Sequence, residues 1–156
     1  MERSYTRRET AGKADDPMSY TPPVTEQRFV LDHVVGIADL AADERYAAAT
    51  PDLVDAIVEG AGAFAEGEYA PLNRIGDEVG AVWKDGTVSM PEGFHAAYRA
   101  FVENGWGSIS APEAFGGQGL PHVLATVVME DLGTANMGFS LINMLTPGAI
   151  EALIAH

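Results

Sequence analysis

The residues best placed for chemistry lie in a glycine-rich stretch, GWGSISAPEAFGGQGLP, at residues 105–121. Gly116, Gly117 and Gly119 can adopt backbone angles that other residues avoid, so the chain can turn sharply there. One acid and one amide side chain inside the stretch add possible ligand groups. A loop of this kind can cradle a phosphate, form a packing corner or cover a ligand, and these alternatives predict different functions.

The known phosphate-binding motifs do not fit this loop. GGQGLPH lacks the G-x-G-x-x-G spacing and follows no strand, and no Gly-Lys-Ser/Thr comes after it as a P-loop requires. The sequence also lacks the G-x-S-x-G, H-E-x-x-H and EF-hand patterns. We therefore expect Gly116, Gly117 and Gly119 to be turn and packing residues of a structural loop, not phosphate ligands.

The other residue types offer little for catalysis. The chain has no cysteine, which excludes disulfides, thiolate catalysis and cysteine zinc sites, and its four histidines are isolated from one another. Among 23 Asp and Glu side chains some carboxylates will be close by chance, so no acid–base pair is identified. The sequence predicts no metal site, and His33 and His95 are expected to be structural or solvent-facing.

Composition limits the class of partner. The chain has 156 residues, 47% of them hydrophobic, which suits one globular domain with a core. The net charge of −14 falls entirely within residues 18–156. It repels phosphate backbones, so we expect no nucleic-acid binding. No apolar run approaches the ~20 residues of a membrane helix and no signal peptide opens the chain, so we expect no membrane span and a cytoplasmic location.

Helical periodicity accounts for most of the chain and predicts an all-α fold, an orthogonal bundle of about six helices. Residues 1–23 are expected to be a flexible tail, and residues 24–156 to form the helical domain. The helices are expected near residues 25–41, 51–69, 91–105, 121–133, 136–145 and 147–156.

Local signals set the limits of these helices. Thr25 and Thr50 are expected N-caps, the second of them followed by a proline at the first helical position. The second helix is expected to end before Pro71, and Thr146-Pro147 to start the last helix in the same way. Asp85-Gly86, between two short apolar runs, predicts either a small hairpin or an ordered surface loop.

Two further features concern packing and completeness. Gly60 and Gly62 lower helix propensity inside the second helix, which indicates that another helix crosses closely there. The last helix stops at His156 in the middle of its apolar pattern, so we expect the chain to be a piece of a longer protein.

The sequence contains an ordered series of motifs: Ala70-Pro71-Leu72-Asn73-Arg74, Gly76-Asp77, the helix start Pro91–Tyr98, Gly105-Trp106, Pro112-Glu113, Gly116–Pro121, Glu130, Asn136 and Thr146–Ala149. This series resembles the N-terminal domain of the flavin-dependent acyl-CoA dehydrogenases. The likeness covers residues 20–156. The opening MSYTPPVTEQRFVL is similar to the branch that includes methylthiopropionyl-CoA dehydrogenases.

The resemblance implies a three-part flavoprotein of which this chain matches only the first part. The family has an N-terminal helical domain, a central β domain and a C-terminal helical domain, and it oxidises acyl-CoA to 2,3-enoyl-CoA. Its FAD contacts lie mostly in the other two domains, and the glutamate that removes the α-proton lies in the C-terminal one. We therefore expect no catalytic residue in this chain, and we expect it alone to be inactive and to bind no FAD.

The resemblance also implies which residues would line the acyl-binding pocket. The helix after Asn136 would run beside the acyl tail of acyl-CoA, with Leu141, Ile142, Leu145 and Thr146 nearest to it. The whole enzyme would use an electron-transfer acceptor and form a homo-oligomer. The alternative is a stand-alone, non-catalytic helical interaction module that docks through the apolar face exposed when the other domains are missing.

Overall fold

The computed structural model of the chain describes residues 20–156, and these are helical apart from one small hairpin. The elements are α1 Val24–Val30, a π-helical turn Leu31–Val35, α2 Ile37–Ala41, α3 Pro51–Phe64, a π-helical turn Ala65–Tyr69, α4 Ala70–Glu78, β1 Val82–Lys84, β2 Thr87–Ser89, α5 Phe94–Glu103, α6 His122–Ala135, α7 Met137–Ser140 and α8 Leu145–Ala155, with 3-10 turns at Glu44–Tyr46, Trp106–Ser108, Glu113–Phe115 and Leu141–Asn143. The prediction of an all-α bundle is confirmed.

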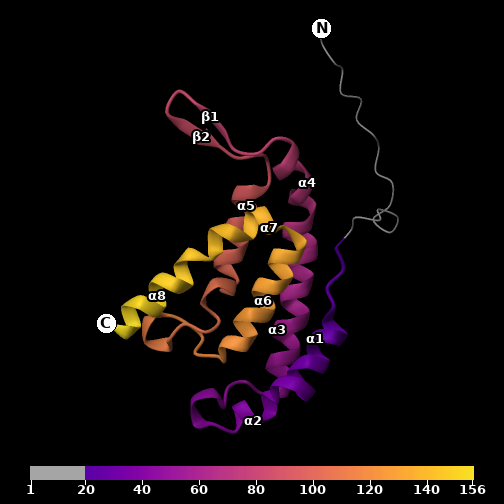
Figure 1. Cartoon of the computed structure of the whole chain (residues 1–156), viewed down its shortest axis with the longest axis vertical. Coiled ribbons are helices and arrows are strands. Elements are labelled where there is room, and N and C mark those ends of the chain that lie inside the picture. The colour runs from indigo at the N-terminus through magenta and orange to yellow at the C-terminus, as the bar shows by residue number, and fades with distance from the viewer. Residues whose placement is uncertain (1–19) are drawn as a thin grey trace.

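The core forms where α3 packs along α6, and Figure 1 shows these two helices side by side. Thr50 caps α3 as predicted, because its Oγ1 accepts a hydrogen bond from the Leu53 N–H at 3.3 Å. Apolar residues then recur at helical spacing along the buried face of α3, at Val54, Ile57, Val58, Ala61 and Ala65. This stripe meets Leu124, Val127, Val128 and Leu132 of α6 in one cluster of buried residues.

The prediction that the second helix ends before Pro71 is wrong. A π-helical turn at Ala65–Tyr69 connects α3 directly to α4, and the helix continues to Glu78. Proline lacks an N–H and its ring crowds the carbonyl four residues earlier, but the wider π-turn accommodates both effects. The carbonyl of Tyr69, at the end of this turn, accepts a hydrogen bond from Asn136 Nδ2 at 3.2 Å, which ties the turn to the start of α7.

The segment expected to be a flexible tail is only partly described. Residues 1–19 lie outside the described residues, whereas residues 20–23 lie against the bundle, contrary to the prediction. Pro22 packs onto α3, where a Cβ added to Gly62 would lie 2.6 Å from the Pro22 Cβ. Helix α1 begins at Val24 with Pro23 at the N-cap position, so Thr25 does not cap it.

The two helical glycines of α3 do permit close approach, but no helix crosses there. A Cβ at Gly60 would lie 3.2 Å from Trp106 Cη2, so the indole ring fills that space. Gly62 makes room for Pro22 in the same way. The two glycines therefore indicated close packing correctly, but each of them packs against one side chain and not against a crossing helix.

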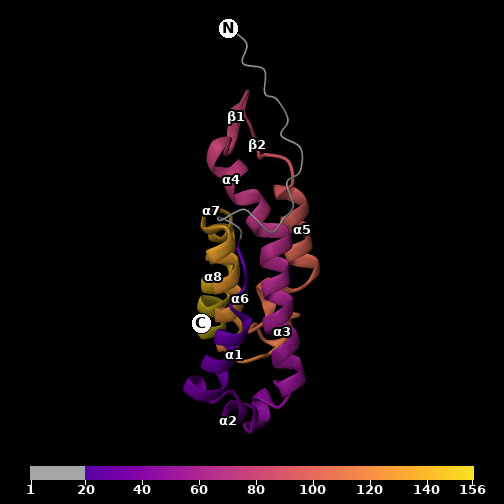
Figure 2. The same ribbon diagram turned by 90° about the vertical axis from the view of Figure 1, so that its right-hand side faces the viewer.

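Of the two alternatives for residues 82–89, the structure contains the hairpin. Val82 pairs with Ser89, Trp83 with Val88 and Lys84 with Thr87. Asp85 and Gly86 both have positive φ, at 51° and 81°, which suits the tight two-residue turn. Figures 1 and 2 show the hairpin extending away from the bundle, and both strands are exposed.

The C-terminal segment departs from its predicted limits. Asn136 caps α7 by accepting a hydrogen bond from the Phe139 N–H at 3.0 Å, and a 3-10 turn follows. Helix α8 begins at Leu145, so Thr146-Pro147 lies within its first turn and Thr146 is not a cap. A proline is tolerated there because the first N–H groups of a helix have no intrahelical acceptor.

Candidate functional site

The glycine loop forms a closed corner between α5 and α6. Gly116 and Gly119 have φ of 83° and 63°, in the region that favours glycine. Gly117 packs directly on the backbone carbonyl of Ala111, and an added Cβ would overlap it. Each N–H group of residues 116–120 donates to a carbonyl within the protein. These amides are therefore used for folding and are not free to bind a phosphate.

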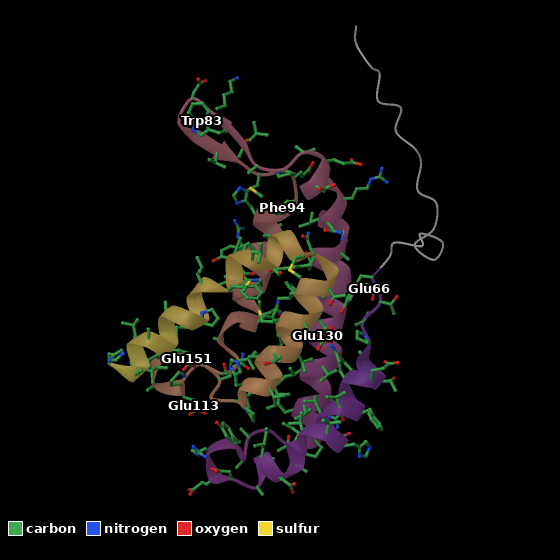
Figure 3. All side chains as sticks on the ribbon, in the orientation of Figure 1. Glu66, Trp83, Phe94, Glu113, Glu130 and Glu151 are labelled. Atoms are coloured by element: carbon green, nitrogen blue, oxygen red, sulfur yellow. The ribbon has the colours of Figure 1, made fainter. Side chains whose placement is uncertain are left out.

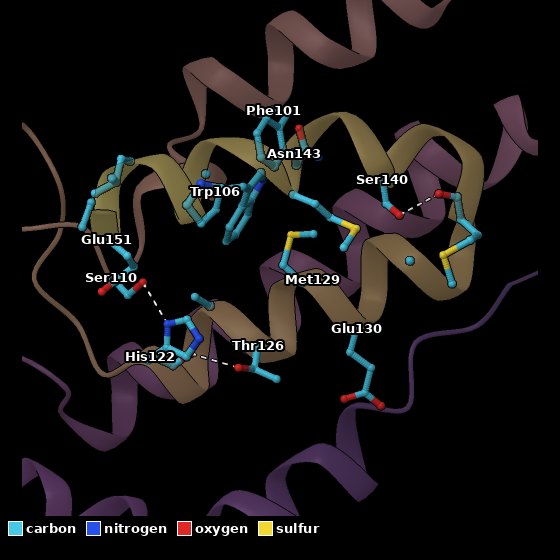
Figure 4. A pocket seen from close by; sticks show the side chains of 18 residues that line it. Phe101, Trp106, Ser110, His122, Thr126, Met129, Glu130, Ser140, Asn143 and Glu151 are labelled. Atoms are coloured by element: carbon cyan, nitrogen blue, oxygen red, sulfur yellow. Dashed lines mark hydrogen bonds between the residues drawn. The ribbon is translucent and has the colours of Figure 1, made fainter. Parts of the chain in front are cut away.

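A pocket of about 680 Å³ lies between α5, α6 and the segment that runs from α7 to α8 (Figure 4). Its lining residues are Phe101, Trp106, Gly107, Ser110, Ala111, His122, Ala125, Thr126, Met129, Glu130, Gly133, Met137, Ser140, Asn143, Met144, Pro147, Ile150 and Glu151. This volume lies within the range of small-molecule binding sites.

The interior of this pocket is mainly apolar. Figure 4 shows the Trp106 ring and Met129 directed into it from different sides. Three methionines contribute to the lining, and their flexible, polarisable side chains can adapt to an irregular ligand. No lysine or arginine lines the pocket, so an anionic group would find no cationic partner. These walls suit an apolar chain better than a phosphate.

Asn143 adds a buried polar group to the apolar lining, and it is paired with Tyr69 behind the pocket wall. Asn143 is 6% exposed, and its Nδ2 donates to the hydroxyl of Tyr69 at 3.1 Å. Tyr69 is fully buried and lies among aromatic rings, with the Phe139 ring centroid 4.6 Å away. Burial raises the pKa of the Tyr69 hydroxyl, so this group is neutral and can donate or accept a hydrogen bond.

The rim of the pocket carries groups that could suggest catalysis, but their geometry does not support it. Ser110 Oγ lies 3.4 Å from His122 Nδ1, a long contact between exposed side chains. Within the described residues no carboxylate orients the His122 ring, as a nucleophile–base pair requires. Glu130 and Glu151 line the pocket as exposed side chains. The site is therefore described as a binding pocket.

The four residues predicted to line an acyl pocket do not come together in this one. Leu141 and Leu145 are 51% and 83% exposed, Thr146 is exposed, and none of the three lines the pocket. Ile142 lines a separate pocket of about 360 Å³, which also involves Phe94. This pocket lies on another face of the helical segment than the one expected to meet an acyl tail, and that expected contact stays a prediction.

The residues that sequence reasoning missed have a recognisable spacing. Met137, Ser140, Met144, Pro147 and Glu151 recur three and four residues apart, so they occupy one face of the helical segment. That face combines apolar side chains with a buried serine and asparagine. Polar residues inside a nearly uncharged helix were the signal that could have identified it.

A second polar cluster lies away from the pocket, around Asp131. Its side chain is 0% exposed, and its Oδ1 accepts hydrogen bonds from the Tyr20 hydroxyl at 2.8 Å and from Gln27 Nε2 at 2.7 Å. Burial raises the pKa of the Asp131 carboxyl, and the two hydrogen bonds partly offset this. Glu130, the adjacent acid, is exposed.

The isolated histidines take no part in a metal site among the described residues. His33 and His95 are exposed, and the His33 ring lies 4.9 Å from that of Phe29. No group of three or more His, Asp or Glu side chains within residues 20–156 is arranged to hold a metal ion.

The expectation that no apolar stretch has the length of a membrane helix is wrong. Residues Met137–Ala155 form a 19-residue helical stretch that is long and apolar enough to cross a membrane by length and composition. This is weak evidence for a span, because apolar helices of soluble proteins have the same properties. Phe139 and Asn143 of the stretch are buried against Tyr69, which places its first part in the core.

Comparison with known proteins adds independent information. The family model described as acyl-CoA dehydrogenase, N-terminal domain, matches residues 52–156. A 3-methylmercaptopropionyl-CoA dehydrogenase from Ruegeria pomeroyi (strain ATCC 700808 / DSM 15171 / DSS-3) is 39% identical over 136 residues, which is 87% of this chain and 23% of the relative. An (R)-benzylsuccinyl-CoA dehydrogenase from Thauera aromatica is 33% identical over 79 residues, which is 49% of this chain and 20% of the relative. The chain thus spans less than a quarter of these curated relatives.

Proposed function

The chain belongs to the acyl-CoA dehydrogenase family, and we propose that it forms one wall of the acyl pocket in an FAD-dependent enzyme that oxidises acyl-CoA to 2,3-enoyl-CoA. One observation carries this proposal. The apolar pocket is lined only by residues between 101 and 151, all of them inside the part of the chain that matches the family. A domain of this family with an apolar hollow of this size fits a wall that binds an acyl tail.

In this proposal the chain's own residues bind the tail and exclude water. Met144 and Pro147 take the place of the predicted Leu145 and Thr146 as the groups nearest the tail, together with Ser140 and Asn143. A water-free surface of this kind holds the substrate in position while the α-proton and the β-hydrogen are removed. We assign no catalytic base here, because Glu130 and Glu151 are exposed side chains.

The described residues do not by themselves fit FAD. The pocket offers no lysine or arginine for a pyrophosphate, and the amides of the glycine loop are used internally. When bound, FAD would supply the hydride acceptor. We propose that parts of the enzyme beyond this chain hold the flavin and supply the base, and that the chain alone is inactive.

The substrate is proposed from the same family. The relative that matches most of this chain is named for a CoA thioester of a short thioether acid, and the other for one of an aromatic diacid. We propose a CoA thioester as substrate, with a short thioether tail as the first to test. An electron-transfer acceptor, a homo-oligomeric state and a cytoplasmic location complete the proposal.

A matched pair of substitutions tests the pocket. Met144 lines it and its neighbour Leu145 does not, so Met144→Trp should fill the pocket and Leu145→Trp should not. The measurement is the bleaching of flavin absorption by acyl-CoA in the purified full-length protein. We expect Met144→Trp to slow bleaching by about tenfold or more, because the indole would occupy the space of the acyl tail, and Leu145→Trp to leave it nearly unchanged. The absence of bleaching with every acyl-CoA would refute the proposed function.

The alternative, a non-catalytic interaction module, is favoured by one observation. Leu145 and Leu153 on α8 are 83% and 80% exposed, and Ile154 is 49% exposed. Exposed apolar surface of this kind promotes association. Sedimentation of the chain should then show a self-associated species that Leu153→Glu abolishes, with no flavin in the native protein.

A further inference from the structure

The indole ring of Trp106 lies between the pocket and helix α3. Trp106 begins the 3-10 turn that follows α5, and Figure 4 shows its ring directed into the pocket. One edge of the ring lies against α3, where a Cβ added to Gly60 would be 3.2 Å from Trp106 Cη2 and 3.6 Å from Cζ2. No residue of α3 lines the pocket. The closeness of this ring to α3 therefore decides how much of the pocket it occupies.

The main chain that carries the ring is fixed by the glycine-rich loop. The carbonyl of Gly105 accepts hydrogen bonds from Gln118 Nε2 and from the Ser108 N–H, both at 3.0 Å. The N–H of Gln118 donates in turn to the carbonyl of Ser108 at 3.0 Å. Gln118 thus bonds to both ends of the turn that contains Trp106. The loop supports the pocket by holding this turn in place.

The ring itself is held by packing and not by a hydrogen bond. Trp106 Nε1 is enclosed by protein and has no partner within residues 20–156. The ring centroid of Phe64, on α3, lies 6.0 Å from that of the indole. A Cβ at 3.2 Å would be closer than the roughly 3.5–4.0 Å optimum between carbon atoms, so a side chain at Gly60 must displace the ring. Since the main chain is fixed, the displacement moves the indole away from α3 and toward the pocket.

We propose that Trp106 is a specificity-determining residue that limits the length of the acyl tail, and that Gly60 is a positioning residue that lets the indole lie against α3. This inference rests on the proposed function, because the tail must occupy this pocket. Removal of the indole opens space to longer tails. A side chain at Gly60 pushes the indole inward and excludes them. The two positions therefore act on tail length in opposite directions.

Two straight-chain thioesters, butanoyl-CoA and octanoyl-CoA, test this limit. The second-order rate constant of flavin bleaching is measured with each of them in the purified full-length protein. The readout is the ratio of the octanoyl-CoA value to the butanoyl-CoA value. A general loss of stability lowers both rate constants and leaves their ratio unchanged, whereas a change in the size of the pocket alters the ratio.

We expect Trp106→Ala to raise this ratio by about tenfold or more, because even one methylene group in an apolar pocket changes such rate constants by about tenfold or more. Gly60→Ala should lower the ratio by about threefold, because one methyl group moves the ring only slightly, and it carries the test if Trp106→Ala does not fold. Gly67→Ala is the matched control. It adds the same methyl group in the π-helical turn that continues α3, where nothing lies within 4 Å of the added Cβ, and it should keep the native ratio.

The outcomes separate this inference from the proposed function. A ratio that stays native in both variants, or that moves in the same direction in both, overturns the role of Trp106 and leaves acyl-CoA oxidation standing. A ratio that rises in Trp106→Ala and stays native in Gly60→Ala keeps the role of Trp106 and overturns that of Gly60. If neither thioester nor any other acyl-CoA bleaches the flavin of the native protein, the proposed function fails, and this inference fails with it.

Discussion

Within residues 20–156, the buried polar clusters around Asp131 and Asn143 differ in what surrounds them. Around Asp131, the carboxylate Oδ2 and the Gln27 Oε1 are enclosed by protein and have no partner. Asn143, in contrast, lines a pocket of about 680 Å³, and its amide is not among the enclosed atoms without a partner. An enclosed unpaired atom is a cost that folding must offset, whereas an open one is available to a ligand. The difference assigns a structural role to the first cluster, and it leaves the second cluster at the wall of the proposed binding pocket.

The architectural cluster joins distant parts of the chain. Tyr20 precedes α1 and Gln27 lies within it, and both donate to Asp131 on α6. In Figure 3, Glu66 and Glu130 lie near the path of the N-terminal segment, so this region carries several acids. No arginine or lysine pairs with Asp131 among the described residues. The buried acid is held by hydrogen bonds alone.

The largest expected effect is the loss of Asp131. Asp131→Ala leaves the Tyr20 and Gln27 donors without their acceptor and creates a cavity, so we expect the free energy of unfolding to fall by about 2–4 kcal/mol. Asn143→Ala should cost about 1 kcal/mol, because the pocket can hydrate what remains. Urea denaturation of both variants measures the difference. Equal losses of unfolding free energy in the two variants would contradict the difference between the Asp131 and Asn143 clusters.

The pH dependence sharpens the same distinction. The pKa of Asp131 is raised in the folded state above the 3.8 of an ordinary carboxyl. Its contribution to stability is therefore complete below pH 3.8 and is lost as the pH rises through the folded pKa. In Asp131→Asn this loss should be missing, because the amide does not ionise.

The measurement is the free energy of unfolding from pH 3 to 8 for the native chain and for Asp131→Asn. Glu66 and Glu130 are present in both proteins, so the difference between the two curves isolates Asp131. We expect the free energy of unfolding of Asp131→Asn, compared with that of the native chain, to be higher at neutral pH than at acid pH. Parallel curves would show that Asp131 titrates as an ordinary carboxyl.

Tyr20 tests how firmly the segment before α1 is attached. Tyr20→Phe removes one hydrogen bond to Asp131 but keeps the ring, so we expect a loss of about 1 kcal/mol in the free energy of unfolding. Tyr98→Phe is the matched control, because Tyr98 is 48% exposed and its hydroxyl has no partner within residues 20–156. If both variants lose the same amount, Tyr20 does not anchor the segment.

Features with a local cause were predictable from sequence. The cap at Thr50 and the turn at Asp85-Gly86 depend only on neighbouring residues. The cap formed as predicted, and the turn formed the hairpin, which was one of the two alternatives that the sequence left open. The continuation of α3 through Pro71 and the docking of residues 20–23 depend on partners far along the chain, on Asn136 and Asp131, which a local pattern does not contain.

The candidate site follows the same rule. Sequence identified the apolar helical segment after Asn136, because its composition is a local property. Which face of that segment borders a pocket depends on where α5 and α6 lie, so the pocket-facing residues Met144 and Pro147 were missed in favour of Leu145 and Thr146. The pairing of Asn143 with Tyr69 could not be predicted from a local pattern either, because the two residues lie 74 positions apart.

The smallest expected effect concerns Ser140, which is buried like Asn143 and lines the same pocket. Its Oγ bonds to the carbonyl of Met137, one turn earlier in the same helix, so Ser140→Ala removes a local bond and leaves no distant donor unpaired. We expect the free energy of unfolding to change by less than about 0.5 kcal/mol. A loss as large as that of Asn143→Ala would show that burial alone sets the cost of a polar group. The contrast between enclosed and open clusters would then have to rest on ligand binding and not on stability.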